Sequence, residues 1–381
     1  MATNTEQEPI GAAALERALS LRDLTDPAQG PHAMQVLLAR VAEGLHALWP
    51  GAELRVRRGD PIVTVADNYD RLGYPPDAVA RDSRYTRWVG PGRLLRTHST
   101  ALVPPALREM ALEPEPPPDV LLLCPGLVWR RDVVDRLHTG APHQVDVWRA
   151  RSGPGLTRGD LLALVGALLE SALPGCRWRT VEAWHPYTLR GLQVDVEHEG
   201  AWVEVAECGL ASPRLLRECG LSPDRWSGLA LGAGVDRLLM LAKGIDDIRL
   251  LRSDDPRVTA QLLDLAPWRP VSSQPAVRRD LSIAVASDRT AEELGDRVRE
   301  AMGPEADALE ALEVLAETPA ESVPSAAAAR IGLGRCQKNV LLRLVIRHPT
   351  RTLTTEEANR IRNAVYAAVH EGAAWQWAAG S

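Results

Sequence analysis

The order of strand and helix patterns before residue 250 constrains the fold most strongly. Val120–Cys124 is an apolar run, and His143–Trp148 alternates polar and apolar residues as a half-buried strand does. A helical pattern and three more strand patterns follow at 161–173, 178–181, 192–196 and 202–205. Consecutive strands without intervening helices exclude a regular βαβ arrangement. The sequence therefore predicts an α+β fold, with helices flanking an antiparallel or mixed sheet.

A segment rich in Pro and Ser near residue 270 divides the chain. After it, strand patterns at 281–285, 309–316, 328–334 and 340–346 combine with helical patterns at 291–301 and 355–369. Split βαβ units of this size are typical of a ferredoxin-like α/β sandwich. We therefore predict five parts: a flexible leader (1–30), a first domain (31–265), a linker (266–274), a second domain (275–372) and a tail (373–381).

Charge and cysteine content limit the class of protein. The formal net charge of −6 gives no global basic field, although a local patch could still bind nucleic acid. The five cysteines form no CxxC pair, which favours reduced thiols in a cytoplasmic protein. The N-terminus resembles neither a secretory signal nor a transit peptide, and no apolar run approaches the ~20 residues of a membrane span. We therefore expect a cytoplasmic protein without a membrane partner.

Two segments carry residues suited to phosphate chemistry. Trp129-Arg130-Arg131-Asp132 precedes the polar strand that starts at His143, and an arginine fixed on a strand could hold a phosphate through two hydrogen bonds. The alternative is a solvent-exposed hairpin with surface ion pairs. Gly228–Gly234 alternates small residues that let a ligand approach the backbone, and Arg237 follows it. Its glycine spacing excludes a dinucleotide fingerprint, and the chain has no GxSxG, HExxH or P-loop.

Taken in order, these segments resemble motifs 1, 2 and 3 of class II aminoacyl-tRNA synthetases. The amino-acid sequence of these segments is similar to that of the phenylalanine–tRNA ligase family, above all its single-chain organellar form. The matching stretches are Asn68–Asp70, Leu95–Thr100, Trp129–Asp132 with Asp135 and His138, His143-Gln144, Trp202–Val205 with Cys208-Gly209, and Gly228–Arg252. Pro275–Ser282 and Arg347–Glu357 resemble the ferredoxin-fold anticodon-binding domain. The resemblance covers roughly residues 55–372 and implies a class II synthetase antiparallel sheet flanked by helices, followed by a ferredoxin-like sandwich.

The resemblance implies roles for the matching residues. Arg130 would hold the α-phosphate of ATP and act as a catalytic residue by neutralising charge, together with Arg237, which would reach the adenine or the γ-phosphate. Asp132 would accept from the adenine amino group, and His138 would complete the ATP site. Glu204 would belong to the shell of Mg²⁺, which prefers carboxylate oxygen. The amino acid would be bound by His98, Thr100, Gln144, Asp146, His185, Tyr187, Ala230 and Gly232.

Several positions depart from the family pattern. Pro142 stands where a Phe normally stacks on adenine, and His185 and Tyr187 replace two Phe residues of the amino-acid pocket. The remaining departures are Leu189 for Glu, Asp146 for Glu, and Ala206-Glu207 where Gly or Leu is usual. A histidine in such a pocket is either packed and satisfied or part of an altered specificity, and the sequence leaves both open.

The sequence is compatible with three functions. The first is a ligase that activates an aromatic amino acid with ATP and Mg²⁺ as an aminoacyl adenylate and transfers it to tRNA. The second is a biosynthetic paralogue that passes a different amino acid to a non-tRNA acceptor, and the third is a non-catalytic tRNA-binding protein. For the first, we expect residues before the linker to suffice for activation and the second domain to be needed for tRNA charging.

Overall fold

The computed structural model describes residues 9–82, 85–131, 133, 135–271, 275–348 and 351–375. The chain divides into two compact units. The first comprises Met1–Arg130, Ala141–Ile245 and Thr259–Trp268, and the second comprises Arg131–Gly140, Asp246–Val258 and Arg269–Ser381. Two segments within the predicted first domain, Arg131–Gly140 and Asp246–Val258, therefore group with the C-terminal part. The domain boundaries at 31–265 and 275–372 stay predictions.

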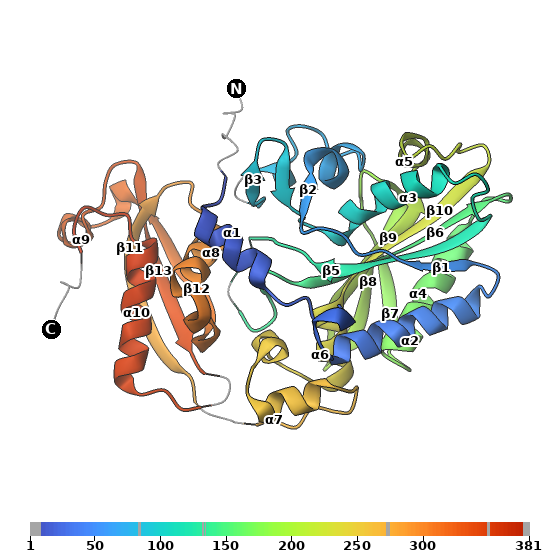
Figure 1. Ribbon diagram of the computed structural model, residues 1–381. Helices are drawn as coiled ribbons and strands as arrows, with labels where there is room; N and C mark the ends of the chain where they lie inside the picture. The colour runs from blue at the N-terminus through green and yellow to red at the C-terminus, as the bar shows by residue number, and fades with distance from the viewer. Residues whose placement is uncertain are drawn as a thin grey trace. The chain divides into compact units, whose positions relative to one another are not determined.

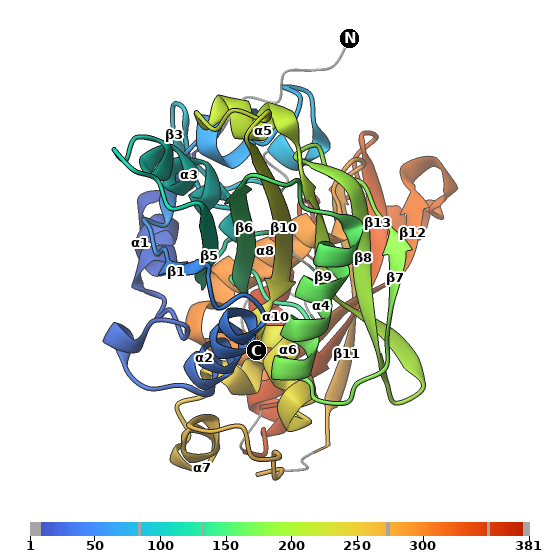
Figure 2. The same ribbon diagram turned by 90° about the vertical axis from the view of Figure 1, so that its right-hand side faces the viewer.

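A seven-stranded sheet forms the centre of the first unit (Figures 1 and 2). Its strands, in spatial order, are β1 (Glu53–Val56), β5 (Asp119–Leu127), β6 (His143–Ser152), β10 (Trp226–Gly234), β9 (Ala201–Ala211), β8 (Thr188–His198) and β7 (Trp178–Glu182). Only β1 pairs in parallel with its neighbour, and every other pair is antiparallel. The predicted α+β class with an antiparallel sheet flanked by helices is confirmed.

Helices cover both faces of this sheet. Figure 2 shows α2 (Ala33–Leu48), α4 (Arg158–Ala172) and α6 (Val235–Lys243) in front of the strands. On the opposite face, α3 (Val103–Ala111) and α5 (Pro213–Glu218) pack against Trp148 and Ala230 in one apolar core. Because strand side chains alternate between faces, Gln144, Asp146 and Trp148 share the face of α3 and α5. That face holds the candidate site.

Part of the predicted leader packs within the first unit. Helix α1 (Ala12–Ser20) buries Ala18 with Leu127 and Trp129. The Ile10 N–H donates to the carbonyl of Trp88 at 2.8 Å. Small and apolar residues at helical spacing give this segment a face that the unit can bury.

The first unit also carries a small three-stranded sheet, ordered β2 (Ile62–Thr64), β4 (Arg93–Leu95) and β3 (Trp88–Gly90). Arg96 follows β4 and is 3% exposed. Its guanidinium donates to the carbonyls of Leu127 at 2.6 Å and Gly59 at 2.8 Å. One buried arginine thus ties the small sheet to the end of β5.

The second unit contains a sheet of order β11 (Val277–Ala286), β13 (Gln337–Ile346) and β12 (Leu309–Pro319), all antiparallel. Helices α8 (Ala291–Met302) and α10 (Thr355–Val369) pack on it in a shared apolar core (Figure 1). The short helix α7 (Pro256–Thr259) lies in the segment that precedes this unit's first strand. The ferredoxin-like assignment stays a prediction, as does the linker boundary, since residues 272–274 lie outside the described residues.

The strand predicted over 328–334 is wrong. Helix α9 (Ser325–Ile331) occupies most of it and ends at Gly332, whose φ of 60° is left-handed. The run Ala326–Ala329 explains the difference, because alanine has the highest intrinsic helix propensity and left-handed glycine commonly ends helices. Among the described residues, no helix is both long and apolar enough to cross a membrane.

Candidate active site

Three adjacent strands bring two carboxylates together around a glycine. On the central strand β10, Gly232 pairs with Asp146 of β6 on one side and with Glu207 of β9 on the other. Ala230, two residues earlier, pairs in the same way with Trp148 and Gly209. A Cβ at Gly232 would lie 3.6 Å from Oδ2 of Asp146, so a larger side chain there would fill the space beside that carboxylate. Small residues on β10 therefore keep the sheet surface open between the two acids.

Asp146 is a buried acceptor for three donors. Its Oδ2 accepts from the hydroxyls of Ser99 at 2.6 Å and Thr100 at 3.1 Å, and its Oδ1 accepts from Trp148 Nε1 at 2.9 Å. Burial raises the pKa of Asp146, and these hydrogen bonds oppose the shift. Gln144 Oε1 accepts from the Ser99 N–H at 3.2 Å, which fixes its amide beside the same segment.

An aromatic cluster lies next to Asp146, formed by Tyr69, Tyr74, His98, Trp148, His185 and Tyr187. Tyr74 stacks on His98 at a centroid distance of 6.0 Å, and Tyr187 stacks on Trp148 at 6.2 Å. Tyr74 and Tyr187 are 6.4 Å apart, which joins the two stacks. Burial raises the pKa of Tyr74 to about 12 and that of Tyr187 well above its usual value, so both phenols stay neutral donors.

His98 brings two unsatisfied nitrogens into this cluster. Part of the residue is exposed, but Nδ1 and Nε2 are both buried and neither has a hydrogen-bond partner among the described residues. Burial, and to a smaller extent the charge of Arg130, lower the pKa of His98 to about 4, while an interaction with the Asn68 backbone opposes the shift. Near neutral pH the imidazole is therefore uncharged and can donate and accept.

His185 and Glu207 form a hydrogen-bonded pair. Nε2 of His185 lies 2.9 Å from Oε2 of Glu207, and the two side chains are 11% and 44% exposed. The hydrogen bond from His185 lowers the pKa of Glu207. The sequence analysis assigned no role to Glu207. Its contact with His185 could not be predicted from the sequence, because that contact depends on how β9 packs against the segment before β8.

Two arginines and Glu204 form the charged part of the site. The Arg237 guanidinium donates to the backbone carbonyl of Glu204 at 2.9 Å. Burial raises the pKa of Glu204, the charge of Glu207 raises it further, and Arg237 and Arg130 oppose both effects. These couplings place two carboxylates and two guanidinium groups within electrostatic range of one another, an arrangement suited to a polyphosphate with a divalent cation.

Arg130 does not lie on a strand, contrary to the prediction. Strand β5 runs through Pro125 and Gly126 and ends at Leu127, so these residues form no turn. Beyond it, the N–H of Val128 donates to the carbonyl of Pro142, and that of Trp129 donates to the carbonyl of Arg96, each at 2.9 Å. Arg130 follows them and is exposed. The two residues before Arg130 are therefore held by backbone hydrogen bonds outside the strand.

A buried pair links two of the candidate residues. Asp236 precedes Arg237 in the first turn of α6, and His143 precedes Gln144 at the start of β6. Oδ1 of Asp236 lies 3.0 Å from Nδ1 of His143, and its Oδ2 accepts from the His143 backbone N–H. The Leu24 N–H donates to Nε2 of His143 at 3.1 Å, so Nδ1 carries the proton and donates to Asp236.

Of the other two residues predicted to bind ATP, His138 groups with the second unit and Asp132 lies outside the described residues. His138 Nδ1 lies 2.8 Å from Oδ2 of Asp135. Burial would raise the pKa of Asp135, but its hydrogen bonds with His138 and Leu137 lower it overall. The structure therefore brings together the amino-acid residues, Arg130, Glu204 and Arg237, whereas it leaves the roles of Asp132 and His138 as predictions.

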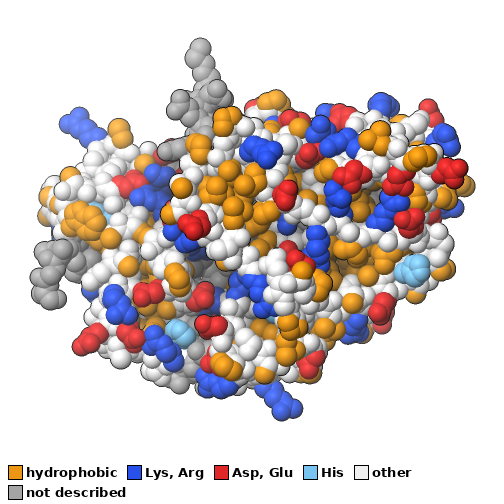
Figure 3. Space-filling model, in the orientation of Figure 1, with side chains coloured by type: hydrophobic (Ala, Val, Ile, Leu, Met, Phe, Trp, Pro, Cys, Tyr) orange, Lys and Arg blue, Asp and Glu red, His pale blue; other side chains and the backbone are white. Residues whose placement is uncertain are grey.

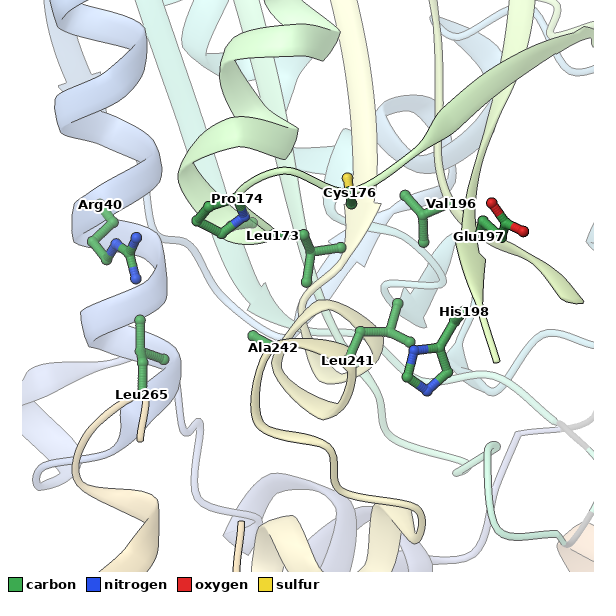
Figure 4. Close-up of a pocket in the computed structure, with 11 residues that line it drawn as sticks. Arg40, Leu173, Pro174, Cys176, Val196, Glu197, His198, Leu241, Ala242 and Leu265 are labelled. Atoms are coloured by element: carbon green, nitrogen blue, oxygen red, sulfur yellow. The ribbon is translucent and has the colours of Figure 1, made fainter. Parts of the chain in front are cut away.

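Two cavities lie apart from these charged groups. One, of about 390 Å³, is lined by Arg40, Leu173, Pro174, Cys176, Val196 and His198 among others, and none of the candidate residues borders it (Figure 4). Another, of about 340 Å³, lies against β1 and α3 and has Trp148 in its wall. Among the described residues, no group of three or more His, Cys, Asp or Glu could hold a metal ion. A Mg²⁺ ion at Glu204 would therefore need phosphate oxygens and water as its remaining ligands.

The comparisons with known proteins agree with this geometry. Residues 23–262 match the family described as tRNA synthetases class II core domain (F). The phenylalanine–tRNA ligase alpha subunit of Prochlorococcus marinus strain MIT 9313 is 38% identical over 63% of this chain and 69% of its own length. The alpha subunit of Synechocystis sp. PCC 6803 is 35% identical over 56% of this chain and 62% of its own. The chain thus spans between about three fifths and two thirds of these relatives.

A solved structure described as pyrrolysyl-tRNA synthetase from Desulfitobacterium hafniense is 18% identical and covers 63% of this chain and 78% of that chain. Its TM-score of 0.45 is too low to support a conclusion. The family match covers more than half of the chain, and it includes Asp146, Glu204, Gly232 and Arg237. The chain therefore belongs to the family of class II tRNA synthetase core domains.

Proposed function

We propose that this chain is a phenylalanine–tRNA ligase-like enzyme that activates an aromatic amino acid with ATP and transfers it to tRNA. The observation that carries the proposal is the arrangement on one sheet face: Asp146, Gly232 and Glu207 lie side by side on three strands. The aromatic cluster borders them, and Glu204 couples to Arg130 and Arg237. An amino acid and a polyphosphate could therefore be held next to each other.

In the first step, the carboxylate of the amino acid would attack the α-phosphorus of ATP and release pyrophosphate. The exposed guanidinium of Arg130 would bind the α-phosphate and offset the negative charge that develops there. Arg237, fixed by its bond to the Glu204 carbonyl, would bind the base or the terminal phosphate. No protein nucleophile is required, because positioning the two reactants can supply much of the rate enhancement.

In the second step, a ribose hydroxyl of tRNA would attack the adenylate carbonyl and release AMP. Asp146 and Gln144 would bind the α-amino group of the amino acid, since both are immobilised by Ser99. Glu204 would be the residue that holds Mg²⁺, since burial and then the charge of Glu207 raise the pKa of its carboxyl and a cation would offset both effects. The bound ion would supply positive charge toward the phosphates of ATP.

We further propose that the second unit binds tRNA and makes this a single-chain form of the enzyme. The support is that the match to the class II core domain ends at residue 262, while the chain continues into the sheet of β11, β13 and β12. On the face drawn in Figure 3, basic side chains are interspersed with acidic ones. Arginines on this face could contact the phosphates of tRNA individually.

The test is ATP–pyrophosphate exchange with a panel of amino acids, followed by charging of total tRNA. We expect exchange with at least one aromatic amino acid and transfer of that amino acid to tRNA. Exchange without transfer to any tRNA would favour a non-tRNA acceptor. Absence of exchange by a folded protein that still binds tRNA would refute the ligase and favour a non-catalytic tRNA-binding protein.

A further inference from the structure

His185 and Glu207 lie on different segments of the chain, His185 just before β8 and Glu207 on β9. Their side chains nevertheless meet, with Nε2 of His185 2.9 Å from Oε2 of Glu207. The folded sheet therefore holds a histidine and an acceptor carboxylate together beside the aromatic cluster.

The pair is continuous with the aromatic cluster. The His185 ring lies 5.6 Å from that of Tyr187, which stacks on Trp148. Glu207 lies across Gly232 from Asp146, with no side chain between them. The His185 side chain is 11% exposed, so its end of this hydrogen bond is largely shielded from water. Glu207 keeps 44% of its side chain exposed. A ligand on this face can therefore reach the carboxylate.

A bare phenyl ring is poorly matched to this environment. It would cover the exposed part of Glu207 and remove its water without replacing the hydrogen bonds. A ring hydroxyl or ring N–H could donate to Glu207 while His185 holds the other side of that carboxylate. Sites built around such a hydrogen bond discriminate strongly against the analogue that lacks it.

We propose that the His185–Glu207 pair is a specificity element that selects an aromatic amino acid bearing a hydrogen-bond donor on its ring over phenylalanine. This inference rests on the proposed function, since it names the substrate class of the same site. Glu207 accepts the donor of the ligand, and His185 is the positioning residue that fixes the carboxylate. The neutral phenols of Tyr74 and Tyr187 supply the ring contacts.

The test compares phenylalanine, tyrosine, meta-tyrosine and 3,4-dihydroxyphenylalanine in two assays, ATP–pyrophosphate exchange and ligand-induced thermal stabilisation. Wild type should favour the best hydroxylated amino acid over phenylalanine by roughly tenfold to a hundredfold in kcat/KM. The double variant H185F/E207A should lose that preference. The conservative variant E207Q keeps the size and an acceptor oxygen, so it should fold normally and retain only part of the preference.

The matched control is E218Q, which breaks the exposed ion pair between Arg214 and Glu218 in the same unit. It should leave the ratio between the two classes of amino acid unchanged. Equal preference for phenylalanine in wild type, E207Q and H185F/E207A would overturn the inference and leave the proposed ligase intact. Absence of exchange with every amino acid, combined with selective stabilisation by a hydroxylated one, would refute the ligase but support the specificity element.

Discussion

Replacing Asp236 by Asn should destabilise the first unit and weaken the candidate site together. In the native structure, the Asp236 carboxylate accepts from both the backbone N–H and the Nδ1–H of the buried His143. An asparagine offers one carbonyl oxygen, so its amide group would face one of these two donors. A buried donor without an acceptor costs about 1–3 kcal/mol, and loss of the charge on the remaining bond costs about 1 kcal/mol more.

The expected decrease in unfolding free energy is therefore about 2–4 kcal/mol. In a unit of this size, that corresponds to a fall in Tm of roughly 5–15 °C. Differential scanning calorimetry and urea unfolding would measure both quantities, and pyrophosphate exchange should fall because Gln144 and Arg237 adjoin the pair. The control E218Q breaks an exposed ion pair and should change stability by less than about 0.5 kcal/mol. A D236N protein whose unfolding free energy lies within about 0.5 kcal/mol of wild type would refute this prediction.

Three further predictions concern catalysis, the second unit and pH. Arg130→Ala should lower the rate of pyrophosphate exchange by about 10²–10³ without changing the thermal unfolding of the protein, and near-normal exchange would exclude its role at the α-phosphate. Deleting residues from 272 onward should abolish activation, contrary to the sequence-based expectation. The reason is that the deletion would remove most of the second unit, with which Arg131–Gly140 and Asp246–Val258 group. Arg249, in the second of these segments, would also lose its contact with the Glu310 carboxylate. Undiminished exchange by the truncated protein would contradict this prediction. Finally, the pKa of His98 is about 4 in the native state against 6.5 when unconstrained, so the unfolded chain binds the proton first and stability is lost as pH falls from about 6.5 to 4. The loss of unfolding free energy due to His98 amounts to roughly 3 kcal/mol at most. Between about pH 6.5 and 4, the difference in unfolding free energy between wild type and His98→Gln should therefore shrink by up to that amount. A difference that does not change with pH would refute this prediction.

The sequence by itself determined most of the local structure. Helical patterns predicted α4, α8 and α10, and strand patterns predicted β6 and part of β9, because these signals act between neighbours along the chain. The exceptions have local causes as well. Alanines favoured α9 over a strand, and small apolar residues allowed α1 to pack where a flexible leader was expected.

The tertiary structure alone decided which residues meet. The register of β6, β10 and β9 sets Asp146, Gly232 and Glu207 side by side, and a shift of one residue would turn each of them to the opposite face. The same packing pairs His185 with Glu207 and His143 with Asp236, contacts between segments up to 93 residues apart. It also groups Arg131–Gly140 with the C-terminal part. No pattern along the chain encodes such pairings, because each is the outcome of burying every apolar face of the unit at once.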